Sequence, residues 1–408
     1  MSDAFSEYQA AASSLEGLVA RSRLTLLGFS VAVDAIHALD AGHIAAIHDA
    51  ASGASGRTRE LFAAVWPLLS AGRDGEVWCD WPDASPQLTG LFPTSLRVGG
   101  NAGQAANVLS ALGVQSLLAL TDRRPAQLAT LGANVRIAEP DGRLVPPADV
   151  TPTSGPGRPL HHVLEFRSGT PLPGGSGAIP RSGRVILRLS HDGPAYDEHF
   201  AAAARVLSGG AGTGLVTGLN KVPPADVDHA YAWCVQRARE WRRAGVRFVH
   251  HELSTYPHQA RTVAALTPVV NSLGLSQSEL VSFAGLPADP AEAAGEVLER
   301  YGLDRVSVHG DRWALTVSRA DPELERQALL VGCLVAAARA ESGAPAMPNG
   351  IPPAAQLLDT ARLPPPLRRR GLAGVCVPTL WLARPAATVG LGDSFVAGTL
   401  LTLGAKLA

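Results

Sequence analysis

The segment of the chain best suited to chemistry lies near its C-terminus, where residues 388–394 read Thr-Val-Gly-Leu-Gly-Asp-Ser. A strand-like run precedes this segment, and an apolar, helix-like run follows it to about residue 403. Gly390 and Gly392 let the backbone approach a ligand closely, and the free N–H groups at the start of a helix bind anions. From these residues alone, Asp393 is either a helix cap or a base that takes a proton from a hydroxyl attacking a bound phosphoryl group.

A second glycine-rich segment, Val-Gly-Gly-Asn-Ala-Gly at 98–103, leads into an amphipathic run at 104–112. It contains neither GxGxxG nor GK[ST], so neither a dinucleotide fingerprint nor a P-loop is supported. The same holds for the glycine-rich run at 208–214. Each segment is either a tight turn or a ligand loop.

Apolar, β-branched runs alternate with helix-like patterns, which predicts a layered α/β domain with a mostly parallel sheet. The predicted helices include 104–112 and 224–243. Two stretches, 35–93 and 151–194, fit this rhythm poorly, and we expect them to form a smaller lid. The predicted large domain comprises 20–34, 94–150 and 195–408, and the predicted strands are 24–27, 115–120, 162–166, 185–189, 246–250, 268–270, 305–308 and 375–377.

Composition excludes several classes of protein. With 46% hydrophobic residues the 408-residue chain is too apolar to be disordered, and a formal net charge of −1 offers no electrostatic case for nucleic acid or an acidic membrane. The four cysteines show no CxxC spacing, which argues against a zinc site, and no apolar run reaches the roughly 18 residues of a membrane span. The N-terminus shows no secretory signal pattern, so we expect a cytoplasmic protein; its oligomeric state is not indicated.

Four segments in order resemble one family. They are the Gly-Gly turn at 99–100, Val-His-His-Glu-Leu-Ser at 249–254, Val-Asn-Ser-Leu-Gly-Leu-Ser-Gln-Ser-Glu-Leu at 270–280, and the segment 388–394. Together they resemble the ADP-dependent glucokinase and phosphofructokinase family of the ribokinase-like superfamily, and the glucokinase type more than the phosphofructokinase type. The resemblance implies a three-layer α/β/α domain with a mostly parallel central sheet and a smaller α+β lid.

The resemblance implies a role for each matching residue. Asp393 falls on the family's catalytic base, Gly390 and Gly392 on its anion hole, and Arg184 on an arginine that approaches the phosphoryl group. Glu252, in an HxE pattern with His250, and Glu279, the acid of an NxxE pattern, would hold Mg²⁺ largely through water. Without the resemblance, such carboxylates at strand ends are more often solvated. The sugar-binding positions correspond to Asp34, Glu76, Gly100, Asn101 and His161.

The chain departs from the family pattern at several asparagines, which are replaced by Ser30, Ala32, Gly183 and Ser276. Glu76 is expected to repel a sugar phosphate and so to favour an unphosphorylated sugar. We therefore expect an ADP-dependent kinase that transfers the β-phosphoryl group of ADP to a glucose-like hexose, yielding hexose 6-phosphate and AMP. The alternatives are a kinase of the same fold for another polyol, nucleoside or sugar-bearing metabolite, with ADP or ATP, and a non-catalytic nucleotide or sugar sensor.

Overall fold

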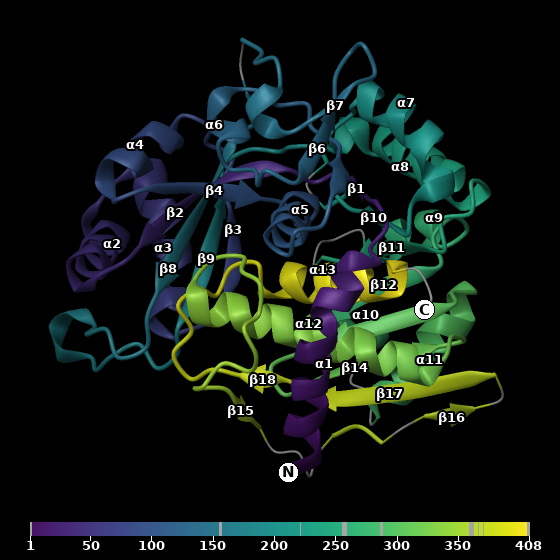
Figure 1. The fold of residues 1–408 in the computed structure, drawn as a ribbon. Coiled ribbons are helices and arrows are strands. Elements are labelled where there is room, and N and C mark those ends of the chain that lie inside the picture. Colours follow the sequence, from purple (N-terminus) through teal and green to yellow (C-terminus); the bar gives the residue numbers. More distant parts are fainter. Residues whose placement is uncertain are drawn as a thin grey trace.

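The fold is built on two sheets (Figure 1). The computed structural model describes residues 2–154, 157–220, 222–254, 259–285, 289–358, 363–365, 367–369 and 371–405. The larger sheet of these residues has the strand order β16-β17-β14-β13-β12-β11-β10-β1-β5-β6-β7. Its strands are β1 (Thr25–Gly28), β5 (Ser116–Leu118), β6 (Val135–Ala138), β7 (Leu144–Val145), β10 (Thr213–Val216), β11 (Phe248–Glu252), β12 (Ser272–Ser276), β13 (Arg305–His309), β14 (Trp313–Ser318), β16 (Arg368–Arg369) and β17 (Leu372–Pro378).

The centre of this sheet is parallel and covered on both faces. Neighbouring strands pair in parallel from β13 through β12, β11, β10, β1 and β5 to β6, and the strands at both edges are antiparallel. One face packs against α7 (Glu198–Leu207), α8 (Val227–Arg243), α9 (Gln259–Leu266), α10 (Gln277–Ala284) and α11 (Pro290–Tyr301). The other packs against α1 (Ser2–Ala20), α5 (Asn101–Ala111), α6 (Pro125–Leu128), α12 (Pro322–Ser342) and α13 (Leu391–Gly404). The predicted three-layer α/β/α architecture is therefore confirmed.

The smaller sheet has the order β3-β9-β8-β2-β4. Its strands are β2 (Ala32–Ala38), β3 (Gly75–Trp78), β4 (Ser95–Gly99), β8 (Leu160–Phe166) and β9 (Gly183–Arg188). One face packs its own apolar core against α2 (Ala41–Gly53), α3 (Gly56–Ser70) and α4 (Ala84–Leu91), with Leu164 and Phe166 turned toward these helices. Strand β2 begins before the predicted lid segment 35–93, and strand β4 follows the end of that segment. The division of the chain into domains stays a prediction.

Strand register places the polar side chains of the small sheet together. Side chains alternate along a strand, so directly paired residues share a face. Asp34 pairs with His161 and Arg97, and Glu165 pairs with Arg184. These residues therefore lie opposite the helix-covered face. We call this surface the polar face, defined by Asp34, Glu76, Arg97, His161, Glu165, Arg184 and Arg188.

Most predicted elements are present, and one predicted strand is wrong. Residues 268–270 form a turn, where Val269 N–H donates to the Leu266 carbonyl, and the strand begins only at Ser272. The sequence Ser-Leu-Gly-Leu-Ser has no β-branched residue, yet it forms a buried strand because β11 and β13 flank it on both sides. Among the described residues, no helix combines the length and the apolarity needed to cross a membrane. The remaining short elements are η1 (Pro147–Asp149), η2 (Pro173–Gly175), η3 (Ser208–Gly210), η4 (Pro224–Asp226), β15 (Gln356–Leu357) and β18 (Leu380–Trp381).

Two histidines in the core of the smaller part predict a loss of stability in acid. His37 and His162 stack at a nitrogen–nitrogen distance of 2.9 Å, and Thr94 and Ser85 hydrogen-bond their outer nitrogens. Burial lowers the pKa of each ring to about 4. Between pH 6.5 and 4 the unfolded chain therefore binds more protons than the folded chain, and stability falls with falling pH.

We expect the free energy of unfolding, measured with urea, to drop by a few kcal/mol between pH 7 and pH 4.5, at about 1.4 kcal/mol per unit of pKa shift. The double variant His37→Gln/His162→Gln should lose most of this pH dependence. An unchanged slope in that variant would show that other groups cause it.

Candidate active site

Asp393 lies in the first turn of α13, at the junction predicted to bind an anion. Gly390 caps the helix with φ 74°, a left-handed conformation that glycine adopts without strain. The first-turn N–H groups of α13 have no intrahelical partner and the helix dipole adds positive potential there. The Asp393 carboxylate accepts a hydrogen bond of 2.8 Å from the Asn101 side chain. Burial raises the pKa of Asp393, although Asn101 and Arg339 partly offset this effect.

The Gly99–Gly100 turn joins this junction to the small sheet. Gly100 has φ 77°, and a Cβ there would lie 2.4 Å from the Ser30 carbonyl oxygen. A Cβ at Gly99 would lie 2.0 Å from a carboxylate oxygen of Asp34. Only glycines therefore allow Asn101, at the start of α5, to reach Asp393 while Asp34 packs behind the turn.

Asp34 and His161 lie side by side, as their strand pairing requires. Both are buried, and His161 Nδ1 is 3.4 Å from an Asp34 carboxylate oxygen. The other ring nitrogen, Nε2, is 3.3 Å from Asp192 Oδ2. The predicted sugar-binding residues Asp34, Gly100, Asn101 and His161 are thus brought together within a chain of contacts that reaches Asp393.

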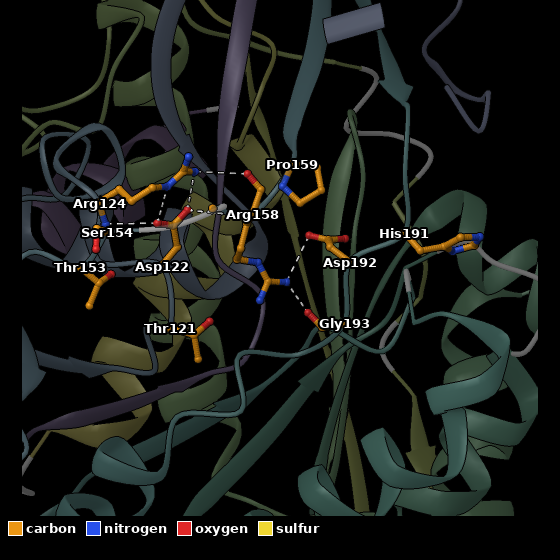
Figure 2. Close-up of a pocket in the computed structure, with 11 residues that line it drawn as sticks. Thr121, Asp122, Arg124, Thr153, Ser154, Arg158, Pro159, His191, Asp192 and Gly193 are labelled. Atoms are coloured by element: carbon orange, nitrogen blue, oxygen red, sulfur yellow. Dashed lines mark hydrogen bonds and ion pairs between the residues drawn. The ribbon is translucent and has the colours of Figure 1, made fainter. Parts of the chain in front are cut away.

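A polar pocket of about 400 Å³ adjoins this group. Figure 2 shows that Arg158 contacts both Asp192 and the Gly193 carbonyl. Asp192 also contacts His161. Beside the Arg158 backbone, Arg124 forms two hydrogen bonds to Asp122. The two guanidinium groups are thus balanced by two carboxylates, and the pocket offers both donors and acceptors.

Two other predicted residues lie farther along the polar face. Glu76 accepts hydrogen bonds of 3.0 and 3.3 Å from the buried Arg188 guanidinium, so its charge is neutralised. The Arg184 guanidinium lies 3.5 Å from Asp74 and is not among the groups that contact Asp393 in the described part of the chain.

The polar face meets the large part of the molecule directly. Thr388, just before the Gly390 turn, donates to Glu165, and Arg97 donates to the Gly343 carbonyl at 2.6 Å. A small gap of about 10 Å³ lies beside these two contacts, and Arg97, Glu165, Arg339 and Val389 are among the residues that line it. The polar face of the small sheet therefore lies against the segment that precedes the Gly390 turn.

Glu252, at the end of β11, is held between two histidines. Its carboxylate oxygens lie 3.0 Å from His250 Nε2 and 3.0 Å from His309 Nε2. Burial raises the pKa of Glu252, but these hydrogen bonds outweigh burial and lower it to about 2. Burial lowers the pKa of His309, but Glu252 outweighs this effect and the pKa is raised overall. The sequence offered no role for His309; the structure places it between Glu252 and Gly392.

A buried network fixes the orientation of Glu252. Arg305 donates to Ser272 Oγ at 3.3 Å, and Ser272 Oγ lies 2.8 Å from His250 Nδ1. If Ser272 accepts from Arg305 and donates to His250 Nδ1, then His250 Nε2–H donates to Glu252. Burial lowers the pKa of His250, which favours this neutral tautomer.

Glu279 occupies the start of α10 and serves as a helix cap. Its carboxylate accepts from the Ser276 N–H at 2.7 Å, and Ser276 Oγ accepts from the Glu279 N–H. Ser276, which replaces a family asparagine, thus completes a capping box. Burial raises the pKa of Glu279, and the charge of Glu252 raises it further.

The two carboxylates fit a hydrated Mg²⁺, which needs only one or two carboxylates when substrate phosphates and water complete its shell. No group of three or more candidate ligands occurs in the described part of the chain, so an all-protein metal cage is not present there.

Gly274 provides the space that Glu252 occupies. A Cβ at this position would lie 1.8 Å from Glu252 Oε2 and 2.7 Å from His250 Nε2. We expect Gly274→Ala to displace Glu252 and to lower kcat about 10- to 100-fold, as loss of a supporting contact does at metal sites. Steady-state kinetics across Mg²⁺ concentrations would measure this loss. Gly295→Ala, whose Cβ would meet only Leu367 at 3.0 Å, is the control, and wild-type kinetics in Gly274→Ala would contradict the prediction.

Several residues of the site escaped sequence reasoning. Arg188 and Arg339 are buried and Asp192 is part-buried, and each contacts a residue from a distant segment, which no local pattern reveals. One signal existed for Arg339: it follows the apolar run Leu329–Ala338, so its helical position predicts a buried charge.

Solved structures share this fold. The structure superimposes with a TM-score of 0.74 on a hypothetical ADP-dependent phosphofructokinase from Pyrococcus horikoshii OT3, at 18% identity over 94% of this chain and 98% of that one. It superimposes with a TM-score of 0.77 on an ADP-dependent kinase in complex with fructose-6-phosphate and ADPβS, at 18% identity over 100% and 99% of the two chains. The chain therefore shares the fold of these ADP-dependent kinases.

Sequence comparison defines the family within this class. Residues 57–402 match the model of the ADP-specific phosphofructokinase/glucokinase conserved region. ADP-specific phosphofructokinases from Pyrococcus furiosus and Pyrococcus abyssi are 23% and 24% identical, over 75% of this chain and 77% and 78% of theirs. The chain belongs to the ADP-specific phosphofructokinase and glucokinase family, and it is an ADP-dependent sugar kinase.

Proposed function

We propose that this enzyme transfers the β-phosphoryl group of ADP to a hydroxyl of a glucose-like hexose, with Asp393 as the base. The observation that carries this proposal is the contact between Asp393 and Asn101, which joins the anion-binding start of α13 to the turn against Asp34. A base and a sugar-binding carboxylate thereby lie on one continuous surface beside a phosphoryl site.

The reaction follows from this arrangement. An Asp393 carboxylate oxygen accepts the proton of the sugar hydroxyl, and the sugar oxygen forms a bond to the β-phosphorus of ADP. The bond between that phosphorus and the bridging oxygen breaks, and AMP leaves with the electron pair. The N–H groups at Gly390–Asp393 stabilise the charge on the transferred group. A raised pKa makes Asp393 a stronger base than an exposed aspartate.

Other residues complete the proposed site. Glu252 and Glu279 would hold Mg²⁺, which supplies positive charge for the phosphates of ADP. Asp34, His161, Gly100 and Asn101 would bind the sugar, since carboxylate, imidazole and amide groups suit its hydroxyls. Arg184 would move toward the phosphoryl group when the small sheet closes over the substrates.

A second acceptor, fructose 6-phosphate, is favoured by one observation. Arg188 neutralises Glu76, so the repulsion expected between Glu76 and a sugar phosphate is reduced. Relatives named as phosphofructokinases agree with this alternative.

A donor-by-acceptor matrix tests the proposal, with ADP and ATP against glucose and fructose 6-phosphate. We expect ADP to exceed ATP and glucose to exceed fructose 6-phosphate in kcat/KM. Glu76→Gln should shift the ratio toward fructose 6-phosphate about 10-fold, because it leaves the positive charge of Arg188 unbalanced near the acceptor. Glu60→Gln, an exposed change on α3, is the control. A preference for fructose 6-phosphate would reverse the acceptor assignment, and ADP binding without transfer would favour a sensor.

A further inference from the structure

Arg339 is a buried cation that pairs with no carboxylate in the described part of the chain. Its side chain on α12 is 4% exposed, and it forms no ion pair with any carboxylate in the described ranges. Its hydrogen bonds go to two neutral groups, Gln104 Oε1 at 2.8 Å and Ser394 Oγ at 3.5 Å, while its Nε has no partner. A guanidinium group in this state remains charged, and burying it without a counter-charge is costly.

The two partners of Arg339 belong to the two glycine turns of the site. Gln104 lies in the first turn of α5, behind Gly100 and Asn101. Ser394 follows Asp393 and donates to the Gly390 carbonyl at 2.8 Å. The Arg339 guanidinium group thus contacts the first turns of both α5 and α13.

The contact with Gly390 is direct. A Cβ on Gly390 would lie 2.4 Å from Arg339 Cζ and 2.5 Å from both terminal nitrogens, so the guanidinium lies against the glycine backbone. The same side chain borders the 10 Å³ gap under the polar face. The carboxyl groups of Asp393, Asp34 and Glu165 act on the pKa of Arg339 through their charge and raise it, although burial lowers it more.

We propose that Arg339 is the positioning residue for the transferred phosphoryl group, because it places a fixed positive charge beneath the Gly390–Gly392 turn. The counter-charge it lacks is then the β-phosphoryl group of bound ADP. This inference rests on the proposed function. It extends that function by assigning the charge at the phosphoryl site to a residue of α12 in addition to the backbone of α13.

The test compares binding of ADP with binding of AMP, which lacks the β-phosphoryl group. Isothermal titration calorimetry on the full chain gives both dissociation constants for wild type, Arg339→Gln, Arg339→Lys and Arg326→Gln. Arg326 is on the same helix but pairs with Glu7 at the surface, so its variant is the control. Thermal unfolding monitors folding in each case.

We expect Arg339→Gln to reduce the preference for ADP over AMP by about 10- to 100-fold, as the loss of charge-assisted hydrogen bonds does. Arg339→Lys keeps the charge and should stay within about 10-fold of wild type, and Arg326→Gln should not differ.

A folded Arg339→Gln that keeps the wild-type preference overturns the inference. If Arg339→Gln does not fold, a loss beyond 10-fold in folded Arg339→Lys overturns it and a smaller loss supports it. Wild type that binds no ADP overturns the proposed function and this inference together, whereas ADP binding and transfer with an unchanged preference in Arg339→Gln overturn the inference alone.

Discussion

Asp393→Asn is expected to lower kcat about 1,000-fold, within the 100- to 10,000-fold range typical of a lost general base. The asparagine keeps the shape of the side chain and an oxygen that can accept from Asn101, so the hydrogen bond of 2.8 Å survives. Only the ability to take the hydroxyl proton is lost. The effect is measured by steady-state turnover with an acceptor that wild type phosphorylates.

The pH dependence of wild type provides an independent check on Asp393. The base must be ionised, so kcat falls as the pH falls through its pKa. Burial raises that pKa, and Asn101 and Arg339 offset the effect only in part, so the loss begins above the pH typical of an exposed aspartate. Glu323→Gln, an exposed change on α12, should leave kcat unaltered. Wild-type turnover in Asp393→Asn would show that another group is the base.

Arg305→Met is expected to destabilise the fold by about 3–5 kcal/mol, because it leaves the Glu325 carboxylate buried without a partner. Arg305 and Glu325 are 0% and 1% exposed, and Arg305 Nε lies 2.9 Å from a carboxylate oxygen. The variant also removes the donor to Ser272 that supports His250 and Glu252, so activity should fall as well.

The double variant Arg305→Met/Glu325→Met separates these effects. Replacing both charges with apolar side chains should restore most of the stability, whereas the support for Glu252 remains lost. Urea unfolding measures the first effect and kcat the second. A double variant no more stable than Arg305→Met would show that the unpaired, buried Glu325 carboxylate is not the cause of the lost stability.

Local sequence chemistry predicted the helix that begins beside Gly390 and most of the alternating strands and helices. Gly390, Gly392 and Asp393 stand at a strand-to-helix transition that residue types alone reveal. The shared face of Asp34 and His161 could not be derived, because it depends on the register between β2 and β8. The same limit applies to Glu76, whose charge is neutralised by Arg188 on the neighbouring strand β9.

The contacts of buried polar residues could not be predicted from the sequence either. His309 and Arg305 stand on an ordinary apolar strand, and their partners Glu252 and Glu325 come from distant segments. Likewise, Gly274 appears as a weak strand residue until the structure shows Glu252 in the space beside it. Tertiary packing determines these roles, and it leaves no periodic trace in the chain.

The proposed reaction transfers the β-phosphoryl group of ADP to a sugar hydroxyl that Asp393 deprotonates. The most direct measurement follows the phosphorus of ADP by ³¹P NMR in a mixture of enzyme, Mg²⁺ and glucose, with a parallel sample containing fructose 6-phosphate. We predict equal amounts of AMP and a new sugar phosphate with wild type, formed at least 100-fold more slowly with Asp393→Asn. ADP that remains unchanged with both sugars, although the enzyme binds it, would contradict the claim.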